Sequence, residues 1–203
     1  SAMRTSEPSP TRAVTTQGRS LFDGNDIYRP VQRTLEPIVH SVSVCPLGDL
    51  SAGDELECRT TAFVGGEDRE FFVSTTDIFL WVTPNPYDAV LARDCTVPGA
   101  TSASIDAMIY QVPLNGETPR ALAARGRPQN QLALDATADE FRALLTWNSG
   151  PCTRGQNAQV RYFHAPLSTF RTAPIAATPN RYVEAPSTGT STYEIRYTNT
   201  HVV

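Results

Sequence analysis

Three residue types in this sequence could together break a glycosidic bond. Arg29 follows a short apolar segment, Ser74 lies within "REFFVSTTDIFLWV" (69–82), and Glu140 lies within "TADEFRALL". Cleavage at a ribose passes through an oxocarbenium-like state that a carboxylate stabilises. A guanidinium holds the anionic part of a phosphorylated substrate, and a small hydroxyl orients both groups in advance. We predict these three as catalytic residues, with Glu117 as the second choice for the carboxylate.

Other motifs with known chemistry are missing from the sequence. It contains no P-loop, no G-x-G-x-x-G, no H-E-x-x-H and no G-x-S-x-G. The three histidines, His40, His164 and His201, lie far apart and lack the spacing of metal ligands. We therefore expect no metal, and we interpret His40 as a structural residue of a strand.

Three segments carry a resemblance to a known family. "DIYRPVQRTLEPI" (26–38) resembles the opening strand of the pertussis- and cholera-type ADP-ribosyltransferase toxins, with Tyr-Arg and a second Arg four positions on. "FFVSTTDIF" (71–79) is similar to the family's aromatic-x-Ser-Thr-Ser/Thr strand. "MIYQV" (108–112) resembles the strand that follows the family's first large helix. The resemblance covers about residues 26–165.

This resemblance implies an NAD-consuming ADP-ribosyltransferase or NAD glycohydrolase of the exported-toxin type. NAD is then the substrate, and strands 26–29 and 71–76 lie side by side, with Glu140 facing the same cleft. The implied NAD-binding residues are Arg29, Arg33, Ser74, Thr75 and Tyr110. The family usually has Gln or Glu two positions before its catalytic Glu, where this chain has Ala138. We therefore expect slow NAD hydrolysis with little transfer to a protein.

The composition fits a folded, exported protein. Of 203 residues, 40% are hydrophobic and 19% are charged, which is typical of a globular domain. The net charge of −4 provides no basic surface for nucleic acid, and no apolar run reaches the roughly 20 residues of a membrane span. All 17 basic residues are Arg. The absence of Lys is typical of a GC-rich genome and also fits avoidance of ubiquitin-acceptor amines in a foreign cytosol. The toxin resemblance implies a host protein target and a delivery or receptor-binding partner.

Four cysteines in a loop-rich chain predict two disulfides and a secreted protein. Of the three pairings available, we predict Cys45–Cys58, because these residues bracket a short turn-rich segment, together with Cys95–Cys152. The opening "SAM" resembles an expression remnant, so we expect that a leader has been removed.

Alternating and β-branched segments predict most of the strands. They lie within 26–44, 60–64, 70–82, 104–114, 158–165 and 193–199. Helical spacing predicts short helices at 85–94, 118–126 and 135–147, the last with Asp135 or Thr137 as its N-cap.

The predicted organisation is one domain with a tail. We interpret residues 1–20 as a flexible lead-in, 21–203 as a single globular domain, and 166–192 as a long loop within it. The predicted fold class is strand-rich α+β, with twisted, mainly antiparallel sheets and a few short helices.

An all-β sandwich is the alternative fold, and it implies a non-enzymatic function. "LSAGDELECRTTAFV" (50–64) resembles an immunoglobulin-like strand pair, and the loops are rich in Pro, Thr and Gly. Such a domain is an extracellular or virion-surface module for receptor binding or adhesion. The two hypotheses differ in one respect: the enzyme requires Arg29, Ser74 and Glu140 to converge in one cleft.

Overall fold

The computed structural model describes residues 24–28, 37–48, 56–83, 106–147, 159–186, 195–198 and 200–203. Within these ranges the chain forms strands and short 3-10 turns, and no α-helix. The predicted strand-rich, mainly antiparallel architecture is therefore confirmed. The described part is closer to the all-β alternative than to α+β.

The strands form three sheets that follow one another along the chain. Sheet A has the order β1-β3-β2, sheet B the order β4-β5-β6-β7, and sheet C the order β12-β11-β10-β8, with β9 also paired to β10. The strands of sheets A and B are β1 (Ile27–Tyr28), β2 (Ile38–Val44), β3 (Arg59–Gly65), β4 (Asp68–Val73), β5 (Asp77–Thr83), β6 (Asp106–Pro113) and β7 (Arg120–Arg125). The strands of sheet C are β8 (Arg127–Pro128), β9 (Leu134–Ala136), β10 (Glu140–Trp147), β11 (Gln159–Pro166) and β12 (Tyr182–Glu184). The 3-10 turns are η1 (Gly24–Asp26), η2 (Gln131–Ala133), η3 (Leu167–Thr169) and η4 (Pro179–Arg181).

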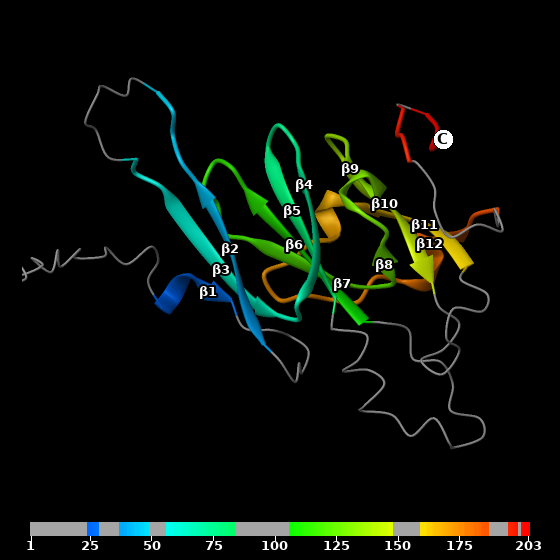
Figure 1. Cartoon of the computed structure of the whole chain (residues 1–203), viewed down its shortest axis with the longest axis horizontal. Helices are drawn as coiled ribbons and strands as arrows, with labels where there is room; N and C mark the ends of the chain where they lie inside the picture. Colours follow the sequence, from blue (N-terminus) through cyan, green and yellow to red (C-terminus); the bar gives the residue numbers. More distant parts are fainter. Residues whose placement is uncertain are drawn as a thin grey trace, which may run out of the picture.

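Sheet B lies between the other two sheets, as Figure 1 shows from left to right. Phe79 and Trp81 of β5 belong to the hydrophobic layer shared with sheet C. Leu80 and Val82, which point the opposite way, belong to the layer shared with sheet A. A strand that is buried on both faces requires apolar residues at nearly every position. This double burial explains the continuous apolar run "IFLWV" (78–82) in β5.

Aromatic side chains fill both layers. Between sheets B and C, the Trp81 and Phe163 rings meet edge to face with centroids 5.6 Å apart, and Trp81 Nε1 donates to Gly126 O at 3.2 Å. Between sheets A and B, the centroids of Phe63 and Tyr110 lie 4.3 Å apart. Burying aromatic rings of this size supplies much of the hydrophobic stabilisation of such a fold.

Sheet B is an antiparallel meander in which consecutive strands are neighbours. Stacked meanders of this kind also build β-propellers, where four-stranded sheets repeat around a channel. The three sheets of the described ranges do not close into a barrel. The outer edge of sheet B is covered, because the backbone of β7 bonds to the segment after η3 through Ala121–Arg171 and Ala123–Ile175. Covering an edge strand removes a site of unwanted strand pairing.

Two of the predicted helices are strands instead. Residues 118–126 contain β7, because its alternating side chains pack on both faces of the central sheet: Leu122 toward sheet C and Ala121 toward sheet A. Residues 135–147 contain β9 and β10, which a turn at 137–139 connects. Ala, Leu and Arg favour helices in isolation, but tertiary packing overrides such propensities. The helix predicted at 85–94 lies outside the described residues.

Several strand predictions are confirmed and others need correction. β2, β3, β6 and β11 lie where the sequence predicted them. The segment 70–82 is two antiparallel strands, β4 and β5, instead of one. The predicted pairing of 26–29 with 71–76 is wrong for the described residues, because β1 pairs with β3 in sheet A. The predicted loop 166–192 contains β12, which pairs with β11. Within 193–199, the described residues contribute one bridge, Tyr197 to Val202.

A disulfide joins Cys45 to Cys58, as predicted. It connects the end of β2 to the start of β3, so it links two neighbouring strands of one sheet. An immunoglobulin-like bridge instead connects two facing sheets. Cys95, Cys152 and the lead-in 1–20 lie outside the described residues. No helix in the described ranges is long and apolar enough to cross a membrane.

Candidate functional site

Ser74 closes the turn between β4 and β5. Its Oγ accepts hydrogen bonds from the backbone N–H of Asp77 at 2.9 Å and of Thr76 at 3.3 Å, and it donates to Asp77 O at 3.0 Å. Serine hydroxyls commonly stabilise turns in this way. Thr75 lies in the same turn and is exposed. Ser74 of the Ser-Thr-Thr sequence therefore stabilises the turn of the β4–β5 hairpin.

Tyr110 points into the layer between sheets A and B. Only 5% of its surface is exposed, and burial raises its pKa to about 12. Its ring packs on Phe63, so the structure does not bring it near Glu140, which lies on the far side of sheet C. Arg29 and Arg33 lie outside the described residues.

Glu140 begins β10 and belongs to the face of sheet C that points away from the core. The alternation along β10 buries Phe141 and Ala143 against sheet B and places Glu140 and Arg142 on the opposite face. The Glu140 Oε1 atom lies 2.9 Å from Nδ1 of His164 on β11. Both side chains are about one-third exposed. A partly exposed carboxylate is thus held in place by an imidazole.

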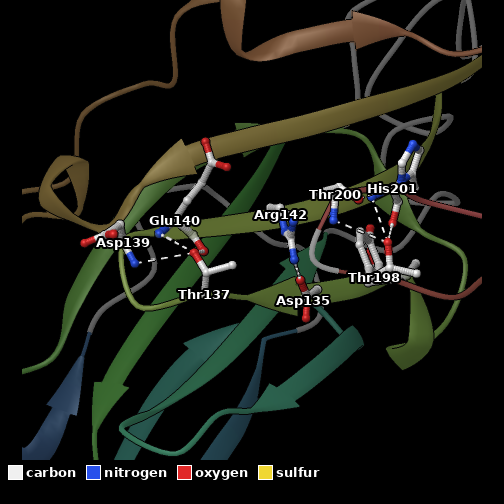
Figure 2. A network of polar contacts seen from close by, with 10 residues as sticks. Asp135, Thr137, Asp139, Glu140, Arg142, Thr198, Thr200 and His201 are labelled. Atoms are coloured by element: carbon white, nitrogen blue, oxygen red, sulfur yellow. Dashed lines mark hydrogen bonds and ion pairs between the residues drawn. The ribbon is translucent and has the colours of Figure 1, made fainter.

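The turn before Glu140 repeats the chemistry of the Ser74 turn. Thr137 Oγ1 accepts from the backbone N–H of Glu140 at 3.1 Å and of Asp139 at 3.4 Å, as Figure 2 shows. The two turns read Ser-x-x-Asp and Thr-x-x-Glu, a pattern that also caps helices. This shared pattern explains why Thr137 was predicted as a helix N-cap.

Arg142 and Asp135 form an ion pair across β9 and β10. Arg142 Nε donates to Asp135 Oδ2 at 2.8 Å, and Nη2 donates to the same oxygen. Burial alone would lower the pKa of Arg142, but the hydrogen bond and charge of Asp135 raise it above the ordinary value. The guanidinium also lies over the ring of Tyr197, with Cζ 5.5 Å from the centroid, a cation–π contact.

Tyr197 belongs to a hairpin near the end of the chain that covers this face. Its hydroxyl donates to Ala133 O at 2.8 Å, and the neighbouring Ile195 is 2% exposed. The hairpin is closed by backbone bonds between Arg196 and Val203 and by Thr198 Oγ1, which accepts from His201 N at 2.9 Å (Figure 2).

A groove of about 610 Å³ lies between this hairpin and the outer face of β10 and β11. We call it the outer groove. Its walls are mostly apolar, and its polar groups come from few side chains. The apolar walls include Leu144, Val160, Ala185, Ile195, Val202 and Val203. Arg142, Tyr162 and His201 supply polar groups. Burial raises the pKa of Tyr162, so its hydroxyl keeps its proton at neutral pH.

Sequence reasoning missed this site because it assigned 135–147 to a helix. A strand assignment would have placed Glu140, Arg142 and Leu144 on one face, since alternate residues of a strand share a face. No local pattern linked them to Ile195 or Val202, which follow about fifty residues later.

Comparison with protein-family models, with curated proteins and with solved structures gives no match for this chain.

Proposed function

We propose that this chain is an extracellular β domain that acts by binding, and that its binding site is the outer groove. The observation that carries the proposal is the groove itself. A concave site of about 610 Å³ with mostly apolar walls and a few polar groups has the size and lining of sites that bind small ligands or buried anchor groups.

The charges around the outer groove favour an uncharged ligand. Arg142 is already neutralised by Asp135, so it attracts an additional anion only weakly. Glu140, on the same face, further disfavours an anion. The guanidinium also hydrogen-bonds the Tyr162 hydroxyl, which can still donate its own proton to a ligand. The proposed ligand is a compact, mostly apolar group with one hydrogen-bond acceptor.

The extracellular location is supported by the Cys45–Cys58 disulfide. Disulfides persist in oxidising compartments and are rare in the cytosol. A stable β domain with a preformed groove suits receptor binding or adhesion.

A fluorescent, uncharged apolar probe such as N-phenyl-1-naphthylamine tests the proposal. We expect its emission to rise on binding to the wild-type protein, and Val202→Glu to weaken binding by about tenfold or more, because it places a charge in the apolar groove. The matched control is Val183→Glu. Val183 is 51% exposed on β12, Val202 is 36% exposed, and Val183 does not line the groove.

The proposal is contradicted if the wild type and both variants bind the probe equally. Such a result, with folding of each variant verified by circular dichroism, would show that the probe does not occupy the outer groove.

A second candidate is the NAD-consuming activity that the toxin resemblance implies. It is favoured by the partly exposed Glu140 carboxylate and its partner His164, since an oriented carboxylate is the group that stabilises an oxocarbenium-like state. If this activity exists, Glu140→Gln should lower nicotinamide release by roughly 10²-fold with little change in KM. Glu184→Gln, an exposed carboxylate on β12, is the control. No nicotinamide release by the wild type above background would exclude this candidate.

A further inference from the structure

A second pocket lies at one end of the layer between sheets B and C. We call it the inner pocket. Its volume is about 580 Å³, and it shares no lining residue with the outer groove. Sheet B contributes Asp77 and Gln111, and the turn before β10 contributes Asp139. The two sites are therefore formed by different residues.

Gln111 carries a buried acceptor that has no partner. The residue is 3% exposed and lines the inner pocket. Its Nε2 donates to Asp77 Oδ1 at 2.9 Å, and its Oε1 has no hydrogen-bond partner among the described residues. An amide flip does not resolve this, because a carboxylate accepts hydrogen bonds and requires the NH₂ group to face it. Buried acceptors without partners are rare in folded proteins.

Asp77 fixes the orientation of this amide. It is 7% exposed, and its second oxygen, Oδ2, accepts from Thr76 Oγ1 at 2.6 Å. Both carboxylate oxygens therefore already accept a hydrogen bond within the protein. Gln111 lines the pocket, and its amide oxygen is the buried acceptor that this arrangement leaves without a partner.

The pocket is acidic. Asp77, Glu117 and Asp139 supply three carboxylates, and Arg120 supplies one guanidinium, so the formal charge is −2. Arg120 Nη2 lies 3.7 Å from Glu117 Oε2 at the exposed rim, so this pair leaves the carboxylates of Asp77 and Asp139 unbalanced. A ligand that donates hydrogen bonds and carries a positive charge matches both the unpartnered amide oxygen of Gln111 and the negative charge of the pocket.

We propose that the inner pocket binds a primary alkylammonium group, such as the side chain of a lysine in a partner or a free diamine. Within the described residues, no group of three His, Cys, Asp or Glu side chains could hold a metal ion. A guanidinium fits less well, because its planar fork is best matched by two oxygens of one carboxylate, and each oxygen of Asp77 already accepts one hydrogen bond. Pro113, Pro166 and Leu167 provide apolar walls for an alkyl chain.

The absence of lysine from this chain fits such a pocket. A second copy has no ε-ammonium group to insert, so the pocket does not promote self-association through lysine side chains. Any lysine that fills it comes from another molecule.

Isothermal titration with N-acetyl-lysine methylamide tests the proposal, with cadaverine as the free-diamine ligand. We expect both to bind, N-acetyl-arginine methylamide to bind more weakly, and the uncharged N-acetyl-norleucine methylamide to bind at least about tenfold more weakly. Preference for the lysine compound indicates a protein partner, whereas preference for cadaverine indicates a free diamine. Added salt should weaken binding, since part of the attraction is between charges at the pocket mouth.

Two variants locate the site. Gln111→Met removes the free acceptor and should weaken binding by at least about tenfold. Asp139→Asn, at an exposed turn position, should weaken it several-fold without affecting folding, while the control Glu184→Gln binds as the wild type does. No binding of either amine at millimolar concentration, or equal binding by wild type, Gln111→Met and Asp139→Asn, would overturn the proposal. Neither result bears on the outer groove.

Discussion

Arg142 and Asp135 face each other on neighbouring strands of sheet C, and Arg142 Nε donates to Asp135 Oδ2 at 2.8 Å. Tyr197 covers the guanidinium from the other side. The charge at the base of the outer groove is therefore balanced before any ligand arrives. This relationship underlies the inference that the groove accepts an uncharged group.

The first prediction concerns this pair. Asp135→Leu leaves the largely buried guanidinium unpaired, so we expect the free energy of unfolding to fall by about 1–3 kcal/mol. In the double variant Asp135→Leu with Arg142→Leu, the free energy of unfolding should decrease by less than the sum of the decreases in the two single variants. Urea unfolding measures all three. Strict additivity would show that the two side chains do not stabilise each other.

The second prediction concerns pH. His40 is 5% exposed, and its Nε2 lies 2.7 Å from Gly66 O. Burial, together with the charge of Arg69, lowers its pKa below 6.5 despite the hydrogen bond to Gly66. Below pH 6.5 the unfolded chain takes up a proton that the folded chain does not yet bind, so stability falls as the pH decreases. We expect the free energy of unfolding to decrease from pH 7 toward pH 5.

His40→Gln tests this linkage, because glutamine can donate to Gly66 O but does not titrate. It should flatten the dependence between pH 7 and pH 5. His201→Gln, at an exposed position, is the histidine control. The interpretation of His40 as a structural residue fails if the two variants respond alike.

The third prediction separates turn formation from catalysis. Ser74→Ala and Thr137→Ala each remove a hydroxyl that accepts two backbone N–H groups. We expect each to lower the free energy of unfolding by about 0.5–2 kcal/mol, as loss of a helix cap does. Chemical denaturation measures the effect, and Thr75→Ala is the exposed control. A catalytic serine without a structural role would give Ser74→Ala a wild-type unfolding curve.

The fourth prediction concerns the disulfide. Cys45 and Cys58 are 13 residues apart, and a loop of that size contributes roughly 3 kcal/mol when closed by a disulfide. The double variant Cys45→Ala with Cys58→Ala should therefore unfold at lower urea concentration than the oxidised wild type. Peptide mapping without reduction should recover the two cysteines in one linked fragment. Recovery of free thiols at these positions would contradict the structure.

Much of sheets A and B was predictable from local patterns. The alternation in "IVHSVSV" predicts β2, and Pro113 with the "NGE" turn predicts the end of β6, where Gly116 has the positive φ of 82° that glycine permits. The spacing of Cys45 and Cys58 also predicted their bridge. These features depend on neighbours in sequence, so the sequence alone carries them.

The layers and the outer groove were not predictable in this way. β7 is composed of residues that favour helices, and only burial between two other sheets makes it a strand. The groove requires Leu144, Val160 and Ile195 to meet, and no local pattern encodes contacts between segments so far apart. Glu140 was predicted as catalytic from the sequence, but its contact with His164 is one that only the pairing of β10 with β11 reveals.

Methyl NMR of the protein titrated with N-phenyl-1-naphthylamine shows whether the outer groove binds an uncharged apolar ligand. We expect the methyl signals of Leu144, Val160 and Ile195 to shift in a saturable manner, because these residues line the outer groove. The methyl signals of Leu122 in the core and Val183 on the exposed strand should stay in place. Saturable shifts at Val73 and Val39, which are exposed on sheets B and A, with none at Leu144, Val160 or Ile195, would contradict this expectation.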